Sequence, residues 1–392
     1  MLNNSFSPWP SFTAEEVNAV ARVLSSNRVN YWTGEECRQF EREFAEWAGS
    51  RRAIAMMNGT VALDSALRAL GIGPGDEVVV TPRSFMASAS CVVTAGAIPV
   101  FADVDADSQN LSAETIHKVL TSKTRAVICV HLAGLPCDMD PIMELAREKG
   151  LKVIEDCAQA HGAKYRGRMV GTIGDVGAWS FCQDKIITTG GEGGMVTTDD
   201  EELWSRMWSY KDHGKSWEAV YERTHPPGYR FVHDSFGTNW RMLELQAVLG
   251  RMQLQRLEHA IEARTANAQQ LAAVCAQFDC IRVAPVPAGV RHAYYRFYAF
   301  VCPERLASGW SRDRIVAEIN AQGVPCFQGT CSELYLEKAF DGTPYRPSAP
   351  MPVARELGLT SLSFLVHPTL SNVEMGKACD VLHKVLRAAG QP

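Results

Sequence analysis

Two polar side chains in this sequence follow strand-like runs, and their chemical types are complementary. Asp156 ends the run 151–156, and Lys185 follows the apolar run 177–181 and precedes a glycine-rich turn. A lysine held among buried residues loses hydration, so we expect the pKa of Lys185 to fall and its amine to become a usable nucleophile.

The pairing of Asp156 with Lys185 indicates a particular cofactor. In open α/β sheets, ligands bind beyond the carboxyl ends of the strands, so both side chains are expected to face one ligand. Pyridoxal phosphate (PLP) needs an amine to form a Schiff base and a carboxylate to keep its pyridine nitrogen protonated. A single lysine would be a weak signal, because most lysines are solvated surface charges.

A third signal lies near the start of the chain. Residues 53–58 read as a strand that runs into a helix, and Gly59 and Thr60 fall at the N-terminus of that helix. Free amide donors and the helix dipole suit a phosphate group there, although such a helix start is also common without a ligand.

The order of the predicted elements indicates two domains. Apolar runs alternate with amphipathic helices up to residue 211, which predicts βαβ units and a parallel sheet. One long amphipathic helix is expected over 243–277, followed by a strand and two helices. We therefore predict a large α/β domain over 1–250, whose N-terminal helix could pack on the small domain, and a small α+β domain over 251–392.

In the order and spacing of these motifs, the chain resembles the DegT/DnrJ/EryC1/StrS family of PLP-dependent sugar aminotransferases. The resemblance extends from Tyr31-Trp-Thr-Gly34 to the segment 361–370. It implies the aspartate aminotransferase fold (fold type I), an α/β fold in which a mostly parallel seven-stranded sheet lies between helices and a smaller α+β domain follows. Lys185 would then be the catalytic amine, and Asp156 would pair with the pyridine nitrogen.

The resemblance also assigns the remaining cofactor contacts. An aromatic at Phe85 would lie against the pyridine ring, although without the family it reads as a core residue. Gln159 would hydrogen-bond the ring oxygen or cover the ring plane. Asn239 would reach the phosphate in the neighbouring subunit, which implies a homodimer with shared sites, although alone it reads as a helix N-cap. The expected phosphate contacts are Gly59, Thr60, Ser180 and Asn239.

Several other positions stay open between a functional and a structural role. His161 either lines the pocket or is a structural histidine. Glu192 is either a turn residue or the partner of a pocket cation. The irregular segment 217–236 is predicted to be an active-site loop. Four cations could meet a diphosphate or could be solvated surface charges: Lys211, His213, Lys215 and Arg230.

The expected reaction is transamination from an amino acid, by resemblance glutamate, to a keto-sugar carried on a nucleotide. A related alternative is an aminotransferase or aminodehydratase that acts on a non-nucleotide cyclic ketone. Dehydrating members of the family carry histidine at the position of Lys185, so this chain favours transamination. A non-catalytic PLP-binding regulator is a third reading, which the intact Lys185 and Asp156 disfavour.

Composition narrows the remaining classes. A net charge of −5 gives no reason to expect nucleic acid or an anionic membrane as a partner. The twelve cysteines show no spacing typical of a metal site or a disulfide framework, so we expect reduced thiols in the cytoplasm. The first ten residues lack the basic end and apolar core of a signal peptide.

Overall fold

A seven-stranded sheet forms the centre of the computed structural model, which describes residues 6–228 and 230–391. The strand order is β1-β9-β8-β5-β4-β2-β3, and only β9 runs antiparallel to its neighbours. The predicted mostly parallel sheet is therefore confirmed. The strands are β1 Arg52–Met56, β2 Glu77–Val80, β3 Ile98–Phe101, β4 Thr124–Val130, β5 Lys152–Asp156, β8 Val176–Ser180 and β9 Gly194–Thr198.

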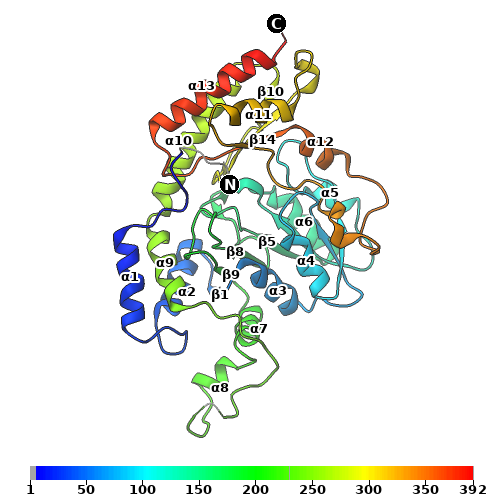
Figure 1. Cartoon of the computed structure of the whole chain (residues 1–392). Coiled ribbons are helices and arrows are strands. Elements are labelled where there is room, and N and C mark those ends of the chain that lie inside the picture. Colours follow the sequence, from blue (N-terminus) through cyan, green and yellow to red (C-terminus); the bar gives the residue numbers. More distant parts are fainter. Residues whose placement is uncertain (1–5, 229, 392) are drawn as a thin grey trace.

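Helices cover both faces of this sheet (Figure 1). On one face, Phe44 of α2 packs against Trp179 of β8, Phe40 of α2 packs against Phe44, and all three side chains are fully buried. On the other face, α3 packs on β8 and β9 and contacts α4 and α7. Each buried aromatic contributes about 1.5–3 kcal/mol. These helices are α2 Glu36–Ala48, α3 Gly59–Ala69, α4 Ala87–Thr94, α5 Ala113–His117, α6 Met139–Lys149 and α7 Glu201–Lys211.

The single long helix predicted over 243–277 is wrong, because the structure contains two helices there. They are α9 (Glu244–Gln255) and α10 (Leu257–Cys275), which meet at Arg256. Arg256 donates to the buried carboxylate of Glu16 on α1 (Ala14–Ser25) at 2.7 Å. Tertiary contacts divide the helix, since α9 packs on α1 and α2 whereas α10 packs on α13 (Asn372–Ala389).

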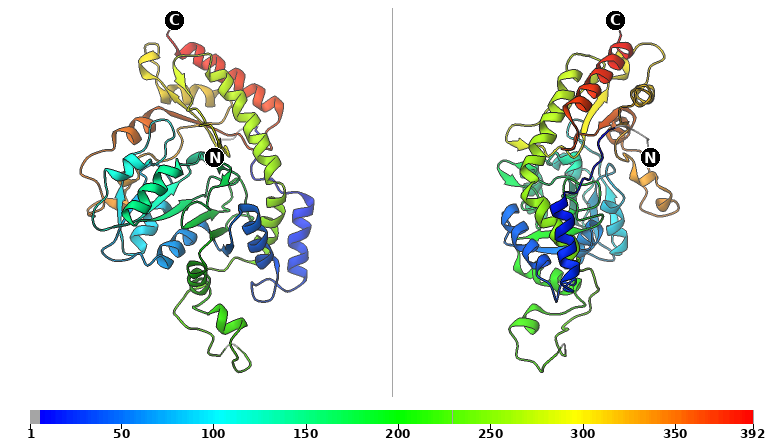
Figure 2. Two further views of the ribbon diagram at one scale, coloured as in Figure 1. Left: turned by 180° about the vertical axis from the view of Figure 1, so that it is seen from behind. Right: turned by 60° about the vertical axis from the view of Figure 1, so that its left-hand side comes forward.

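A second, antiparallel sheet lies above the first, with strand order β10-β12-β14-β13. Figure 2 shows α10 and α13 side by side against it. These elements match the predicted small α+β domain, while its boundaries stay a prediction. The strands and the remaining covering helix are β10 Ile281–Arg282, β12 Phe297–Val301, β13 Cys326–Phe327, β14 Ser361–Phe364 and α11 Arg312–Ala321.

The N-terminal helix α1 packs on α9 and not on the small sheet. The chain before α1 does reach the upper part of the molecule (Figure 2). There the Thr369 hydroxyl donates to the Pro8 carbonyl at 2.8 Å, and the Ser7 amide donates to the Glu374 carboxylate of α13.

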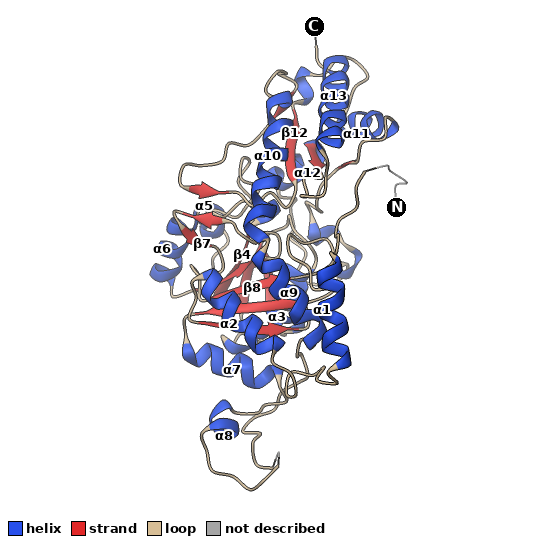
Figure 3. Ribbon diagram, turned by 90° about the vertical axis from the view of Figure 1, so that its left-hand side faces the viewer, coloured by secondary structure: helices blue, strands red, loops and turns tan. Residues whose placement is uncertain are grey.

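A long segment between α7 and α9 stands away from the sheet, at the end opposite the small sheet (Figure 3). It carries one short helix, α8 (Trp217–Tyr221). The other short elements are β6 Lys164–Tyr165, β7 Arg168–Met169, β11 Val290–Arg291, α12 Pro352–Thr360 and 3-10 turns at Leu132–Gly134, Pro303–Arg305, Leu334–Leu336 and Lys338–Phe340. In the described part of the chain, no helix has the length and apolar character needed to cross a membrane.

Candidate active site

A cavity of about 660 Å³ lies between the two sheets, beyond the carboxyl ends of β5 and β8. Every predicted site residue except Asn239 lines it. These residues are Gly59, Thr60, Phe85, Asp156, Gln159, Ser180 and Lys185. Asn239 lies instead in a neighbouring cavity of about 330 Å³, and Asn58 and Glu192 line both. A single chain therefore brings all of the predicted site residues except Asn239 together in one cavity.

Asp156 is held at the inner end of the cavity. It is the last residue of β5 and is buried. Its Oδ2 accepts a hydrogen bond from the Ser88 hydroxyl at 2.8 Å, and its Oδ1 accepts one from the Ala158 amide at 3.1 Å. Burial raises the pKa of Asp156, and these two hydrogen bonds offset part of the rise. The sequence reasoning missed Ser88, which lies on α4 one turn after Ser84. Since the Ser88 hydroxyl donates to Asp156, it accepts from the Ser84 hydroxyl at 2.9 Å.

Lys185 lies in the connection after β8, beyond the last strand residue, Ser180. Its Nζ is 3.4 Å from Asp184 Oδ1 and 5.0 Å from the centre of the Tyr295 ring. The Tyr295 hydroxyl in turn donates to the Asp184 carboxylate. Amine, carboxylate and phenol thus form one connected group.

The expectation of a lowered pKa for Lys185 is wrong. Burial does act to lower it, but Tyr295, Asp184 and Cys182 act in the other direction, and the pKa of Lys185 is raised overall. Tyr295 comes from a distant part of the chain, so the local sequence around Lys185 held no signal for it.

A second part of the cavity suits a phosphate group. Gly59 and Thr60 are the first residues of α3, and the N-cap Asn58 accepts from the Val61 amide at 3.0 Å. A Cβ atom on Gly59 would lie 2.6 Å from the Cβ of Ser180, so only glycine allows the helix to approach β8 this closely. The dipole and the first amides of α3 favour an anion beside the Ser180 hydroxyl.

Two further side chains line the space between these parts. Phe85 is 70% exposed although it is aromatic, so the core interpretation is wrong. Gln159 Oε1 accepts a hydrogen bond from the Ala133 amide at 2.7 Å, which fixes the plane of its side-chain amide. An exposed ring and a fixed amide are suited to contact a flat aromatic ligand.

The residues present fit PLP. One cavity holds a lysine amine, a buried carboxylate, an exposed aromatic ring and a helix N-terminus whose glycine leaves room for a phosphate. These are the groups that the Schiff base, the pyridine nitrogen, the ring face and the phosphate require.

The structure places the residues whose roles the sequence left undecided. His161 is buried against Trp179 and Phe181 and does not line the cavity. Neither of its ring nitrogens has a hydrogen-bond partner among the described residues, and burial lowers the pKa of His161 to about 3. Its role is structural. Glu192 is exposed at the rim of both cavities and forms no ion pair within the described chain.

The four cations considered for a diphosphate do not line the cavity. Lys211 is fully buried, with its Nζ 3.7 Å from Glu41 Oε1, and Lys215 Nζ is 3.1 Å from Asp212 Oδ1. Both the diphosphate and the solvated-surface interpretations are therefore wrong for Lys211. His213 and Arg230 are exposed. The described residues of 217–236 do not line the cavity of their own chain, and the interpretation of this segment as an active-site loop stays a prediction.

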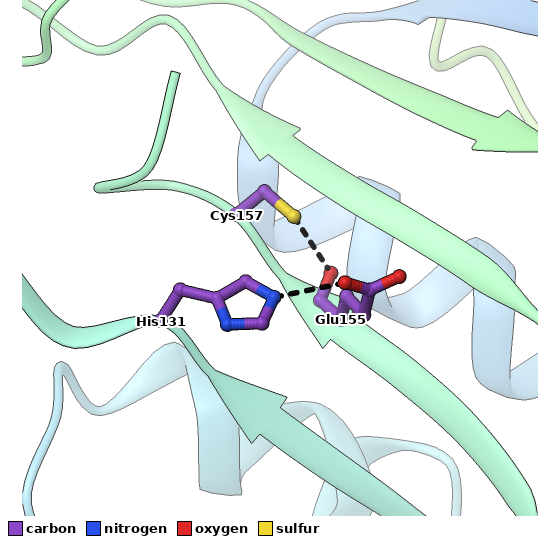
Figure 4. A group of neighbouring side chains, drawn as sticks. All are labelled: His131, Glu155 and Cys157. Carbon is purple, nitrogen blue, oxygen red and sulfur yellow. Dashed lines mark hydrogen bonds and ion pairs between the residues drawn. The ribbon is translucent and has the colours of Figure 1, made fainter. Parts of the chain in front are cut away.

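One group of side chains has the composition of a metal site: His131, Glu155 and Cys157 (Figure 4). The Glu155 carboxylate accepts amide hydrogen bonds from the 171–174 turn at 2.7–2.8 Å, and His131 Nε2 lies 2.9 Å from its Oε2. His131 Nδ1 accepts from the Cys137 amide at 3.0 Å. Because the ligand atoms of His131 and Glu155 are already engaged, this group is structural. It fixes β5, and with it Asp156, beside β8.

The chain is similar to named enzymes over most of its length. The GDP-perosamine synthase of Caulobacter vibrioides is 36% identical over 358 residues, 89% of each chain. A dTDP-3-amino-3,4,6-trideoxy-alpha-D-glucose transaminase of Streptomyces venezuelae is 34% identical over 96% of this chain and 93% of its own.

The chain is also similar to solved structures. The aminotransferase from Psychrobacter cryohalolentis has a TM-score of 0.96 and 61% identity, covering 97% of this chain and 99% of that one. Spr1654 of Streptococcus pneumoniae, solved in a PLP-form, has a TM-score of 0.85 and 25% identity, and the match covers 98% of this chain and 99% of that one. The sequence pattern of one family matches residues 10–383. The chain belongs to the DegT/DnrJ/EryC1/StrS aminotransferase family.

Proposed function

We propose that this protein is a PLP-dependent aminotransferase that moves an amino group from an amino acid, glutamate, to a keto-sugar carried on a nucleotide diphosphate. The observation that carries the proposal is the shared cavity of Lys185, Asp156 and the α3 N-terminus. The names of the relatives from C. vibrioides and S. venezuelae support a nucleotide-linked sugar as the acceptor.

When bound, PLP supplies an electron-accepting ring. Asp156 would hold the proton on the pyridine nitrogen, and Ser88 and Ala158 keep its carboxylate pointed at the cavity. Gly59, Thr60 and Ser180 would bind the phosphate. Lys185 Nζ would remove the proton from the substrate carbon that carries nitrogen and deliver it on the reverse course.

Asp184 and Tyr295 would control the charge of that amine. The Asp184 carboxylate favours the ammonium form of Lys185. The neutral amine is the form that attacks an aldehyde and accepts a proton, so these two neighbours set how much of it is present at a given pH.

We also propose a homodimer with shared sites. Asn239 lies outside the cavity of its own chain, beside exposed apolar side chains that a partner subunit would cover. Phe236 is 95% exposed, and Leu243 and Met57 are 49% and 40% exposed. In this arrangement Asn239 would contact the phosphate in the partner's cavity. A cytoplasmic location is proposed in keeping with the cysteines, all twelve of which are unpaired.

Absorption spectroscopy tests the function directly. The purified protein loaded with PLP should show a visible absorption band that glutamate bleaches, and a keto-sugar nucleotide should restore it. A panel of GDP-, UDP- and dTDP-linked keto-sugars, run against free ketocyclitols, identifies the acceptor class. Absence of bleaching with every amino acid, despite full cofactor loading, would contradict the proposal and favour a non-catalytic PLP-binding protein.

A further inference from the structure

The wall of the cavity opposite α3 carries an arginine that the cofactor contacts do not use. Arg296 lines the cavity, and its guanidinium carbon lies 5.4 Å from the centre of the Tyr295 ring and 5.5 Å from that of Phe327. Two aromatic rings thus hold the guanidinium plane in place. Its Nη1 is buried and has no hydrogen-bond partner among the described residues.

A second arginine lies behind the first. Arg264 on α10 is 1% exposed, and its Nη1 donates to the carbonyls of Tyr294 and Tyr295 at 3.3 Å each. Its Nε and Nη2 are buried and have no partner in the described part of the chain. Burial, and after it the nearby Arg296, lowers the pKa of Arg264 to about 9.

The backbone at Tyr294 and Tyr295, directly before Arg296, is strained and is held by several hydrogen bonds. Tyr294 has φ 47°, a conformation that costs a non-glycine residue about 1 kcal/mol or more. The Tyr294 amide donates to His292 Nδ1 at 2.8 Å, and the Tyr295 amide donates to the Ala133 carbonyl at 2.9 Å. With the Arg264 bonds to the carbonyls, these contacts fix the direction in which Arg296 leaves the backbone before β12.

Neither arginine has an acidic partner. No ion pair joins Arg264 or Arg296 to a carboxylate among the described residues. The Asp184 carboxylate interacts electrostatically with both arginines without forming an ion pair, and it already contacts Lys185 and Tyr295. Arg264 is fully buried and Arg296 is partly buried, and a cation that loses water without gaining an ion pair is costly. An anionic group entering the cavity would compensate this cost.

We propose that Arg296 binds the carboxylate of the amino donor, and that Arg264 positions the backbone that carries Arg296. This inference rests on the proposed function. Arg296 and Lys185 lie within 5.4 Å and 5.0 Å of the centre of the same Tyr295 ring. In an amino acid the carboxylate is bonded to the reacting carbon, so its binding group must lie near Lys185. The diphosphate of a nucleotide sugar is separated from the keto carbon by sugar ring atoms and is a poorer match.

The test is calorimetric titration of the PLP-loaded protein with glutarate, which has the carboxylates of glutamate but no amine. Arg296→Gln should weaken glutarate binding about 10- to 100-fold, because a charge-assisted, bidentate hydrogen bond to the carboxylate is lost. The glutarate affinity of Arg296→Lys should lie between those of the wild type and Arg296→Gln, since lysine keeps the positive charge without the bidentate guanidinium geometry. Dimethyl glutarate, which is neutral, should bind no form of the protein tightly.

Controls separate the donor from the acceptor. GDP and UDP should bind the wild type and Arg296→Gln equally, and the glutamate concentration that half-saturates band bleaching should rise in the variant. Arg282→Gln makes the same change in β10, outside the cavity, and should alter neither the glutarate affinity nor the bleaching by glutamate.

Three results would overturn the inference: unchanged glutarate affinity in Arg296→Gln, loss of nucleotide affinity in its place, or a weakened dimer with glutarate affinity intact. If the wild type binds glutarate through Arg296 but transfers no amino group, the proposed function fails while the carboxylate site stands.

Discussion

The Asp184 carboxylate lies 3.4 Å from the amine of Lys185, next to it in sequence and in the same cavity. This contact, with the Tyr295 ring, raises the pKa of Lys185 against the opposing effect of burial. A raised folded-state pKa means that the ammonium form stabilises the cofactor-free protein below the usual lysine pKa. That contribution is lost as pH rises through the folded-state value.

The first prediction concerns this pH dependence. Asp184→Asn removes the neighbouring negative charge, so the neutral amine of Lys185 should become available at lower pH. The rate at which the cofactor-free protein captures PLP, followed by the visible band, should therefore rise at lower pH than in the wild type. Asp341→Asn, an exposed partner of Arg346 outside the cavity, is the control. An unchanged profile in Asp184→Asn would contradict the assigned role.

The second prediction concerns stability. Glu155→Gln leaves amide donors of the 171–174 turn and His131 without a full set of acceptors, so the free energy of unfolding should fall by about 3–5 kcal/mol. Urea unfolding measures this loss. Glu201→Gln removes an exposed partner of Arg52 and should cost less than about 1 kcal/mol.

The same carboxylate gives a pH prediction with a defined sign. Although burial acts to raise it, hydrogen bonds from His131 and the turn amides lower the pKa of Glu155. A lowered folded-state pKa contributes stability above the usual glutamate pKa, and that stability is lost as pH falls. The wild type should thus lose more stability on acidification than Glu155→Gln does.

Added Zn²⁺ should not change the melting temperature, because the ligand atoms of His131 and Glu155 are already engaged in hydrogen bonds. A large zinc-dependent rise in the melting temperature would mean that this group binds metal.

The third prediction concerns the phosphate contact. Gly59→Ala places a Cβ 2.6 Å from Ser180 Cβ, so α3 must move away from β8. PLP affinity should fall about tenfold or more, as expected when an anion loses well-placed donors. Equilibrium dialysis of the cofactor measures it. Gly376→Ala, in helix α13 with no atom within 4 Å of the new Cβ, should keep normal affinity and gain about 0.5–1 kcal/mol of stability. Normal PLP binding by Gly59→Ala would place the phosphate elsewhere.

The fourth prediction concerns the partner subunit. Asn239→Ala and Lys185→Ala should each bind PLP poorly or catalyse poorly as homodimers. In a mixed dimer, one cavity would combine an intact Lys185 with an intact Asn239 from the other subunit. Mixing the two variants should therefore restore about a quarter of the wild-type activity, since half of the dimers are mixed and each has one intact site. No recovery after confirmed subunit exchange would show that Asn239 serves its own chain.

The sequence predicted the sheet because each strand and helix has a clear local period. Buried strand runs such as β5 and amphipathic helices such as α2 are recognisable without tertiary information. The division of 243–277 into α9 and α10 was not predictable in this way, because it depends on contacts of Arg256 with α1 and on two different packing partners.

The site residues likewise fall into those that local sequence predicts and those that depend on tertiary packing. Asp156 ends β5, Gly59 begins α3, and Lys185 follows β8 in the next connection, so all three lie where the topology of an α/β fold places ligands. Ser88, Tyr295 and Arg296 carry no motif and reach the cavity through the packing of α4 and β12. The pKa direction of Lys185 was missed for this reason, since the deciding partner, Tyr295, is distant in sequence.

The central claim is that Lys185 is the amine that holds PLP. The loaded protein should be reduced with borohydride, digested, and analysed by peptide mass spectrometry. We predict that the reduced cofactor is attached to the peptide containing Lys185 and that Lys185→Ala carries none. Attachment to any other lysine, or no attachment in a fully loaded wild type, would contradict the account.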